Sequence, residues 1–162
     1  MYNLKKEIYF KIIFIISILS LTSAYFIEYI LGYQPCNLCL IERIPYGLGI
    51  LLVILYYILK KSEQFIGLLL IIIFAFSLII SLYHFGIEQS FFKESPVCKI
   101  INNSDILSKE ELLKQLQVKT VSCKDVTFRV FGFSLTTLNI IISIIMLILS
   151  VKIFRKNEKF QK

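Results

Sequence analysis

Four long apolar runs constrain this chain more than any other feature of its sequence. They cover residues 12–31, 40–59, 65–85 and 130–151, and each reaches or approaches the roughly 20 residues that a helix needs to cross a bilayer core of about 30 Å. The chain has 162 residues, of which 57% are hydrophobic and 18% charged. This composition is too apolar for a soluble domain. We therefore expect an all-α membrane protein, built as a bundle of four transmembrane helices.

The basic residues predict how these helices are oriented. The net charge is +7, and ten of the eighteen Lys and Arg residues lie in three short segments, around residues 5–11, 60–61 and 152–162. Cytoplasmic segments of membrane proteins carry such an excess. We expect both termini and the turn at 60–64 to be cytoplasmic, with periplasmic loops at 32–39 and 86–129. Because the charge follows topology, it does not indicate nucleic-acid binding.

All four cysteines fall in the two outer loops, as Cys36, Cys39, Cys98 and Cys123. An even number of thiols on the oxidising face of a membrane predicts two disulfide pairs. Cys-x-x-Cys pairs exchange disulfides more often than they brace folds, so we expect redox chemistry at Cys36 and Cys39. A metal site made of all four thiolates is disfavoured, because such zinc sites use two closely spaced pairs.

The second helix must begin close to the cysteine pair. Starting it at residue 40 gives a length of about 30 Å and draws Glu42 and Arg43 one turn into the membrane interface, where charges are usually functional. Cys39 and Arg43 then lie at i and i+4, so the guanidinium and the helix N-terminus are expected to favour a thiolate at Cys39. Pro45 either kinks the first turn or marks its start.

Three polar residues in the other helices admit more than one interpretation. His84, the single histidine, lies in the last outer turn of the third helix, at the depth of the cysteine pair. It is either a hydrogen-bond donor or proton carrier beside a cofactor, or an interfacial histidine wetted by headgroups. We expect Glu28 to be a solvated carboxylate at a helix end, and Asn139 to hydrogen-bond to a neighbouring helix.

The outer loop at 86–129 is long enough to indicate a function of its own. Residues 108–111 read Ser-Lys-Glu-Glu, a capping-box pattern, and leucines follow at 112, 113 and 116. This pattern predicts a short amphipathic helix inside the periplasmic loop.

The arrangement of helices and cysteines resembles the DsbB family of bacterial inner-membrane, quinone-linked disulfide oxidases. Residues 34–46, which read Gln-Pro-Cys-Asn-Leu-Cys-Leu-Ile-Glu-Arg-Ile-Pro-Tyr, look like the hallmark of that family. Residues 128–135 are similar to the family's entry into the fourth helix, with Phe128 where many members have tryptophan. The resemblance extends over nearly the whole chain.

This resemblance implies a relay of thiol exchanges. A periplasmic DsbA-like protein with a thioredoxin fold attacks a Cys98–Cys123 disulfide at Cys98, and the freed Cys123 attacks Cys36. The released Cys39 passes the electrons to a membrane quinone, either ubiquinone or menaquinone. The resemblance assigns the quinone to a site at Arg43, where His84 assists.

Three alternatives remain from the sequence. Within the enzyme class, the chain is a DsbI-like oxidase that serves a dedicated partner. In a different class, it is a non-catalytic four-helix membrane scaffold with two structural disulfides. An enzyme like vitamin K epoxide reductase is disfavoured, because its loop cysteines precede its Cys-x-x-Cys pair, whereas here they follow it.

Overall fold

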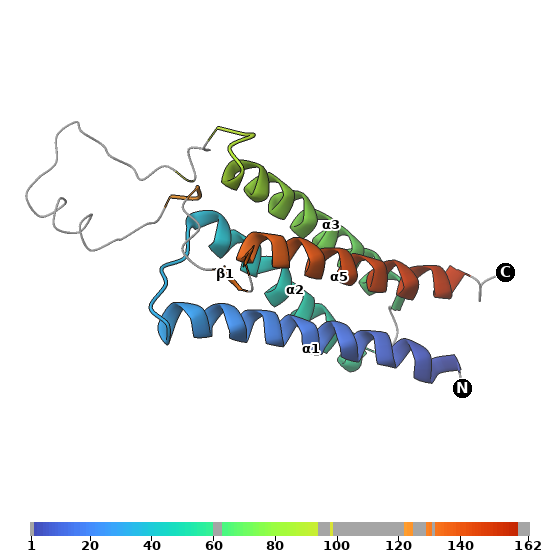
Figure 1. The fold of residues 1–162 in the computed structure, drawn as a ribbon. Coiled ribbons are helices and arrows are strands. Elements are labelled where there is room, and N and C mark those ends of the chain that lie inside the picture. The colour runs from blue at the N-terminus through green and yellow to red at the C-terminus, as the bar shows by residue number, and fades with distance from the viewer. Residues whose placement is uncertain are drawn as a thin grey trace, which may run out of the picture.

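The described residues of the computed structural model form a bundle of four long helices (Figure 1). The structure describes residues 2–59, 63–93, 98, 122–124, 129–130 and 132–158. The helices are α1 (Tyr2–Tyr29), α2 (Asn37–Leu59), α3 (Glu63–Glu88) and α5 (Leu135–Glu158). All four are long and apolar enough to cross a membrane. The prediction of an all-helical, four-span membrane protein is therefore confirmed.

The second helix begins three residues earlier than residue 40, directly after Cys36. The Cys39 N–H donates to the Cys36 Sγ at 3.2 Å, so Cys36 occupies the N-cap position and satisfies one of the free amides of the first turn. Pro45 lies inside α2, and this placement rules out the alternative in which Pro45 marks the start of the helix.

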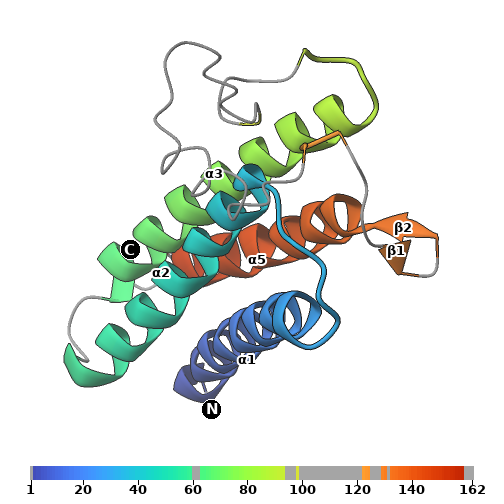
Figure 2. The same cartoon turned by 90° about the vertical axis from the view of Figure 1, so that its left-hand side faces the viewer.

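The fourth helix begins at Leu135 rather than at residue 130. Two short strands precede it, β1 (Arg129–Val130) and β2 (Phe133–Ser134), which pair antiparallel. The turn between them is possible because Gly132 adopts a left-handed φ of 87°. The Ser134 Oγ then accepts the Thr137 N–H at 3.2 Å and caps α5. Figure 2 shows this hairpin projecting from the start of α5 on the side away from α3.

Apolar side chains fill the middle of the bundle, where a fully buried cluster includes Phe10 of α1, Val53 of α2, Phe74 of α3 and Met146 of α5. Many other large apolar side chains along the helices are exposed, as expected of surfaces that face lipid rather than water.

A chain of polar side chains crosses the bundle beside this core. The Asn139 Nδ2 donates to the Ser81 Oγ at 2.7 Å, and the Asn139 Oδ1 accepts the Tyr46 hydroxyl. The Ser77 and Ser143 hydroxyls lie 3.0 Å apart. The prediction that Asn139 bonds to a neighbouring helix is confirmed, and the network joins α2, α3 and α5.

The start of α1, the end of α2, the start of α3 and the end of α5 lie at one end of the bundle, while the start of α2, with the cysteine pair, lies at the other (Figure 1). The two helix ends that flank residues 60–62 therefore lie at the same end of the bundle as the start of α1 and the end of α5. The amphipathic helix predicted from residue 108 lies outside the described residues.

Close helix packing at Gly49 gives a first testable prediction. A Cβ built at Gly49 would lie 3.0 Å from the Phe74 Cζ, whereas one at Gly47 meets nothing within 4 Å. Gly49→Leu should destabilise the protein by about 1–3 kcal/mol through overpacking. Thermal unfolding in detergent, followed by circular dichroism, measures the effect. Gly47→Leu is the matched control, and an equal loss in both variants would show that the effect is not one of packing.

Candidate redox site

Cys36 and Cys39 bracket the first turn of α2. Their Sγ atoms lie 2.6 Å apart, and the structure holds them as two unlinked cysteines. Cys36 is buried, with 6% of its surface exposed, whereas Cys39 is half-buried. The two sulfurs are therefore close enough to close a disulfide with only small side-chain movements.

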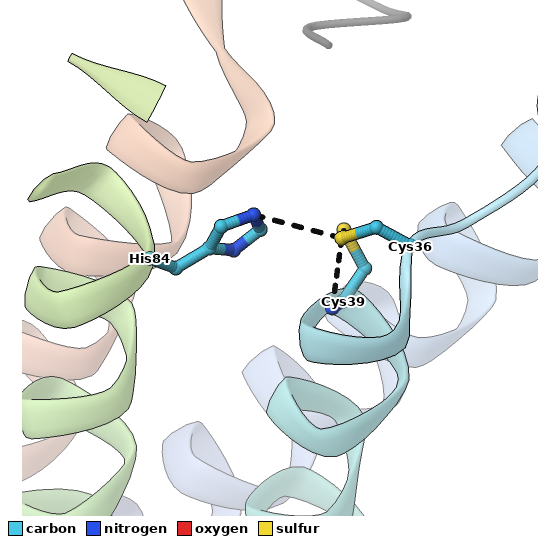
Figure 3. Close-up of side chains that lie close together, drawn as sticks. All are labelled: Cys36, Cys39 and His84. Atoms are coloured by element: carbon cyan, nitrogen blue, oxygen red, sulfur yellow. Dashed lines mark hydrogen bonds between the residues drawn. The ribbon is translucent and has the colours of Figure 1, made fainter. Parts of the chain in front are cut away.

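His84 approaches this pair from α3. Its Nε2 lies 3.5 Å from the Cys36 Sγ, as Figure 3 shows. Its Nδ1 lies 3.0 Å from the Glu42 Oε1. His84 is 4% exposed and Glu42 is 7% exposed. The prediction that His84 lies at the depth of the cysteine pair is confirmed, and the interfacial, headgroup-wetted interpretation is wrong, because both ring nitrogens have buried partners.

Cys36, His84 and Glu42 form a chain of thiol, imidazole and carboxylate. In such an arrangement the carboxylate fixes the orientation of the ring, and the ring then exchanges a proton with the sulfur. The sequence alone predicts no specific role for Glu42. Its position one turn inside the membrane interface was a signal that it is functional, but its partner is 42 residues away and could not be read from spacing.

The structure favours a thiolate at Cys36. The hydrogen bond from the Cys39 side chain lowers the pKa of Cys36 most strongly, and His84 lowers it further, while burial opposes both, so that the pKa falls from 9.0 to about 5. The amide of the first helical turn also points at this sulfur. From the sequence, the helix N-terminus is predicted to act on Cys39. The N-cap position of Cys36 explains why it acts on Cys36 instead.

Arg43 forms an ion pair with Glu28 of α1. The two side chains are 14% and 17% exposed, and the Arg43 guanidinium carbon lies 5.0 Å from the centre of the Tyr25 ring. The expectation that Glu28 is a solvated carboxylate is therefore wrong. α1 passes alongside the start of α2, and the arginine, which cannot lose its charge, requires a counterion at this depth.

The loop cysteines are joined by a disulfide between Cys98 and Cys123, the pairing that the family resemblance implied. Both are buried, at 3% and 4% exposure, and they pack in one apolar cluster with Cys36, Leu38 and Ile87. Two cysteine pairs that are far apart in the sequence therefore meet at one end of the bundle.

A cavity of about 570 Å³ opens beneath the two pairs. Its polar lining includes the side chains discussed above, namely Cys36, Cys39, Glu42, Arg43, His84 and Cys123. Its apolar lining comes from α1 and α5, and includes Leu19, Ala24, Ile27, Leu135, Leu138 and Ile142. A largely apolar pocket with a few convergent polar groups is typical of a site for a hydrophobic small molecule.

Comparison of the sequence with known proteins identifies the family of this chain. The sequence model of the disulfide bond formation protein DsbB matches residues 6–153, which is nearly the whole chain. The chain belongs to the DsbB family. Its role is therefore in disulfide bond formation, and a member of this family is expected to use its cysteines in disulfide exchange.

A relative from Rickettsia prowazekii (strain Madrid E), uncharacterized protein RP370, is 31% identical over 135 residues. The match covers 82% of this chain and 78% of the relative.

The lowered pKa of Cys36 gives a second prediction. In reduced protein carrying Cys98→Ser and Cys123→Ser, the rate at which iodoacetamide alkylates Cys36 should rise with pH around a midpoint near 5, because the thiolate is the reactive form. His84→Ala should move this midpoint upward, since the imidazole no longer stabilises the thiolate. Peptide mass spectrometry after timed alkylation distinguishes Cys36 from Cys39.

Ser81→Ala is the matched control for this measurement, because Ser81 lies one turn below His84 on α3 and bonds to Asn139. It should leave the midpoint unchanged. A midpoint near 9 in the parent protein would contradict the assignment of the thiolate to Cys36.

Proposed function

We propose that this protein is a thiol:quinone oxidoreductase that re-oxidises a periplasmic DsbA-like protein with a thioredoxin fold. The observation that carries the proposal is the packing of the Cys98–Cys123 disulfide against Cys36, at the mouth of a largely apolar cavity lined by Arg43. This arrangement allows the loop disulfide to exchange with the Cys36–Cys39 pair, which in turn lies beside a cavity suited to a lipid-soluble acceptor.

The first exchange occurs in the loop pair. A thiolate of the reduced partner attacks the Cys98 sulfur, and Cys123 leaves as a thiolate. The second partner thiol attacks the mixed disulfide, so the partner leaves oxidised and Cys98 is released. Two electrons now reside on Cys98 and Cys123. Each step is an in-line attack of a thiolate on a disulfide sulfur.

The second exchange moves these electrons to the helix pair. Cys123 attacks Cys36 of a Cys36–Cys39 disulfide and releases Cys39, and Cys98 then attacks Cys123, which re-forms the loop disulfide and releases Cys36. A thiol of low pKa is a good leaving group, so the lowered pKa of Cys36 speeds this last step. His84 stabilises the released thiolate, and Glu42 keeps the Nε2 of its ring directed at the sulfur.

The cavity supports a quinone as the electron acceptor, of the ubiquinone or menaquinone class. A quinone, when bound, accepts two electrons and two protons as the Cys36–Cys39 disulfide re-forms. The apolar lining suits its ring and tail, and Arg43 offers a fixed positive charge to a carbonyl oxygen. His84 is the nearest group that can carry a proton between Cys36 and the cavity.

The charge distribution supports a place in the bacterial inner membrane. The described basic residues Lys152 and Arg155 lie in the last turns of α5, at the end of the bundle opposite the cysteine pair. The positive-inside rule assigns that end to the cytoplasm and the cysteines to the periplasm. Whether the partner is general or dedicated, as in a DsbI-like oxidase, depends on residues in 86–129 that lie largely outside the described part of the chain.

Anaerobic quinone reduction tests this function. Purified protein in detergent, supplied with a reduced thioredoxin-fold partner, should reduce quinone, and both Cys98→Ser and Cys39→Ser should abolish turnover. The two variants should differ in their trapped states: Cys98→Ser should fail to form a mixed disulfide with the partner, whereas Cys39→Ser should still form one. A well-folded parent protein that reduces no quinone with any partner would support the scaffold alternative.

Replacement of Arg43 separates binding of the acceptor from partner exchange. Arg43→Ala should lower quinone reduction by at least tenfold, because it removes the fixed charge in the cavity, while exchange with the partner at Cys98 stays within about twofold. Stopped-flow quinone absorbance and gel-based trapping of the mixed disulfide measure the two steps. Arg155→Ala, at the other end of the bundle, is the control. Equal loss of both steps in Arg43→Ala would show that Arg43 is structural.

A further inference from the structure

The Cys36, Cys39 and His84 side chains together form a set of metal-binding donors. One ligand atom from each of them lies within 4.8 Å of the other two. Two thiolates and one imidazole are the kinds of ligand that Zn²⁺ commonly binds in proteins. The three residues come from two helices, so they form a site only in the folded bundle.

The spacing of these donors agrees with tetrahedral zinc in one respect and needs a small change in another. The His84 Nε2 and the Cys36 Sγ are 3.5 Å apart, the separation of about 3.5 Å expected when zinc binds nitrogen at about 2.1 Å and sulfur at about 2.3 Å. The two sulfurs are 2.6 Å apart and would have to separate by about 1 Å to span a tetrahedral angle. Cys39 is half-buried, and rotation of its side chain achieves this.

The surroundings of the site also suit a metal. Glu42 accepts a hydrogen bond from the Nδ1 side of His84 at 3.0 Å, which leaves Nε2 free as the ligand. Carboxylates commonly orient zinc-binding histidines in this way. The cavity lies beside both cysteines and His84, so a water molecule or another small ligand can occupy the fourth position. Two thiolates also neutralise the metal charge, which lowers the cost of burying it.

We propose that the reduced Cys36–Cys39 pair and His84 form a zinc site that exists only while the pair is reduced. Binding of Zn²⁺ displaces one proton from each thiol and moves no electrons. The disulfide form offers no thiolate and does not bind. The bound metal holds both sulfurs of the helix pair, so it would stop the exchanges at these two cysteines. The binding itself requires only reduced thiols, and does not depend on which acceptor oxidises them.

Cobalt binding tests this site by spectroscopy rather than by activity. The protein with Cys98→Ser and Cys123→Ser is reduced anaerobically in detergent, freed of reductant and titrated with Co²⁺. We expect one equivalent to bind, with thiolate-to-cobalt charge-transfer bands and the strong visible bands of tetrahedral cobalt, and Zn²⁺ should displace it. The same protein with its Cys36–Cys39 disulfide closed should show neither band. Both measurements use the same double-serine chain, so no further substitution contributes to the difference between them.

Two variants test the remaining ligand and its support. His84→Ala should weaken Zn²⁺ binding at least tenfold, and Glu42→Gln should weaken it by about 10–100-fold. Glu7→Gln is the matched control, because Glu7 is exposed near the start of α1, at the end of the bundle opposite the cysteine pair, and it should bind as the parent does. Equal binding by the oxidised and reduced forms, unchanged affinity in His84→Ala, or the weak bands of octahedral cobalt would each overturn the proposal.

Discussion

The buried contact between His84 and Glu42 is the interaction on which the rest of the redox site depends. A carboxylate and an imidazole with so little exposed surface are costly to bury unless they satisfy each other, and their pairing ties α2 to α3 at the level of the cysteines. The same contact directs the opposite nitrogen of the ring at Cys36. One hydrogen bond thereby fixes the relative position of two helices and the environment of the reactive sulfur.

A second buried ion pair holds α1 against this unit. Arg43 and Glu28 connect α2 to α1, and α1 supplies much of the apolar lining of the cavity. The two acidic residues therefore have separate tasks. Glu42 orients the His84 ring, which in turn contacts the Cys36 sulfur. Glu28 pairs with Arg43 and so holds α1, which lines the cavity, against α2. Because each acid neutralises one cationic or protonatable partner, the charges at this depth are compensated locally.

Much of this molecule could be predicted from its sequence, because the strongest signals are local. The lengths of the apolar runs indicate the four helices, and the spacing of Cys36 and Cys39 indicates redox chemistry. The start of α5 was missed, since it depends on a hairpin only two residues long per strand. The partners of Glu28 and Glu42 were missed for a different reason: they lie 15 and 42 residues away, and their pairing depends on how the helices rotate against one another.

The burial of Cys36 affects which molecules can reach its sulfur atom. With 6% of its surface exposed, this sulfur is shielded from water by the loop disulfide on one side and by the helices on the other. A charged tripeptide thiol of the glutathione kind would have to shed its hydration shell to reach it, at a cost of several kcal/mol. The neighbouring Cys123 already lies inside that shield. The burial of Cys36 is therefore expected to slow its reaction with small charged thiols.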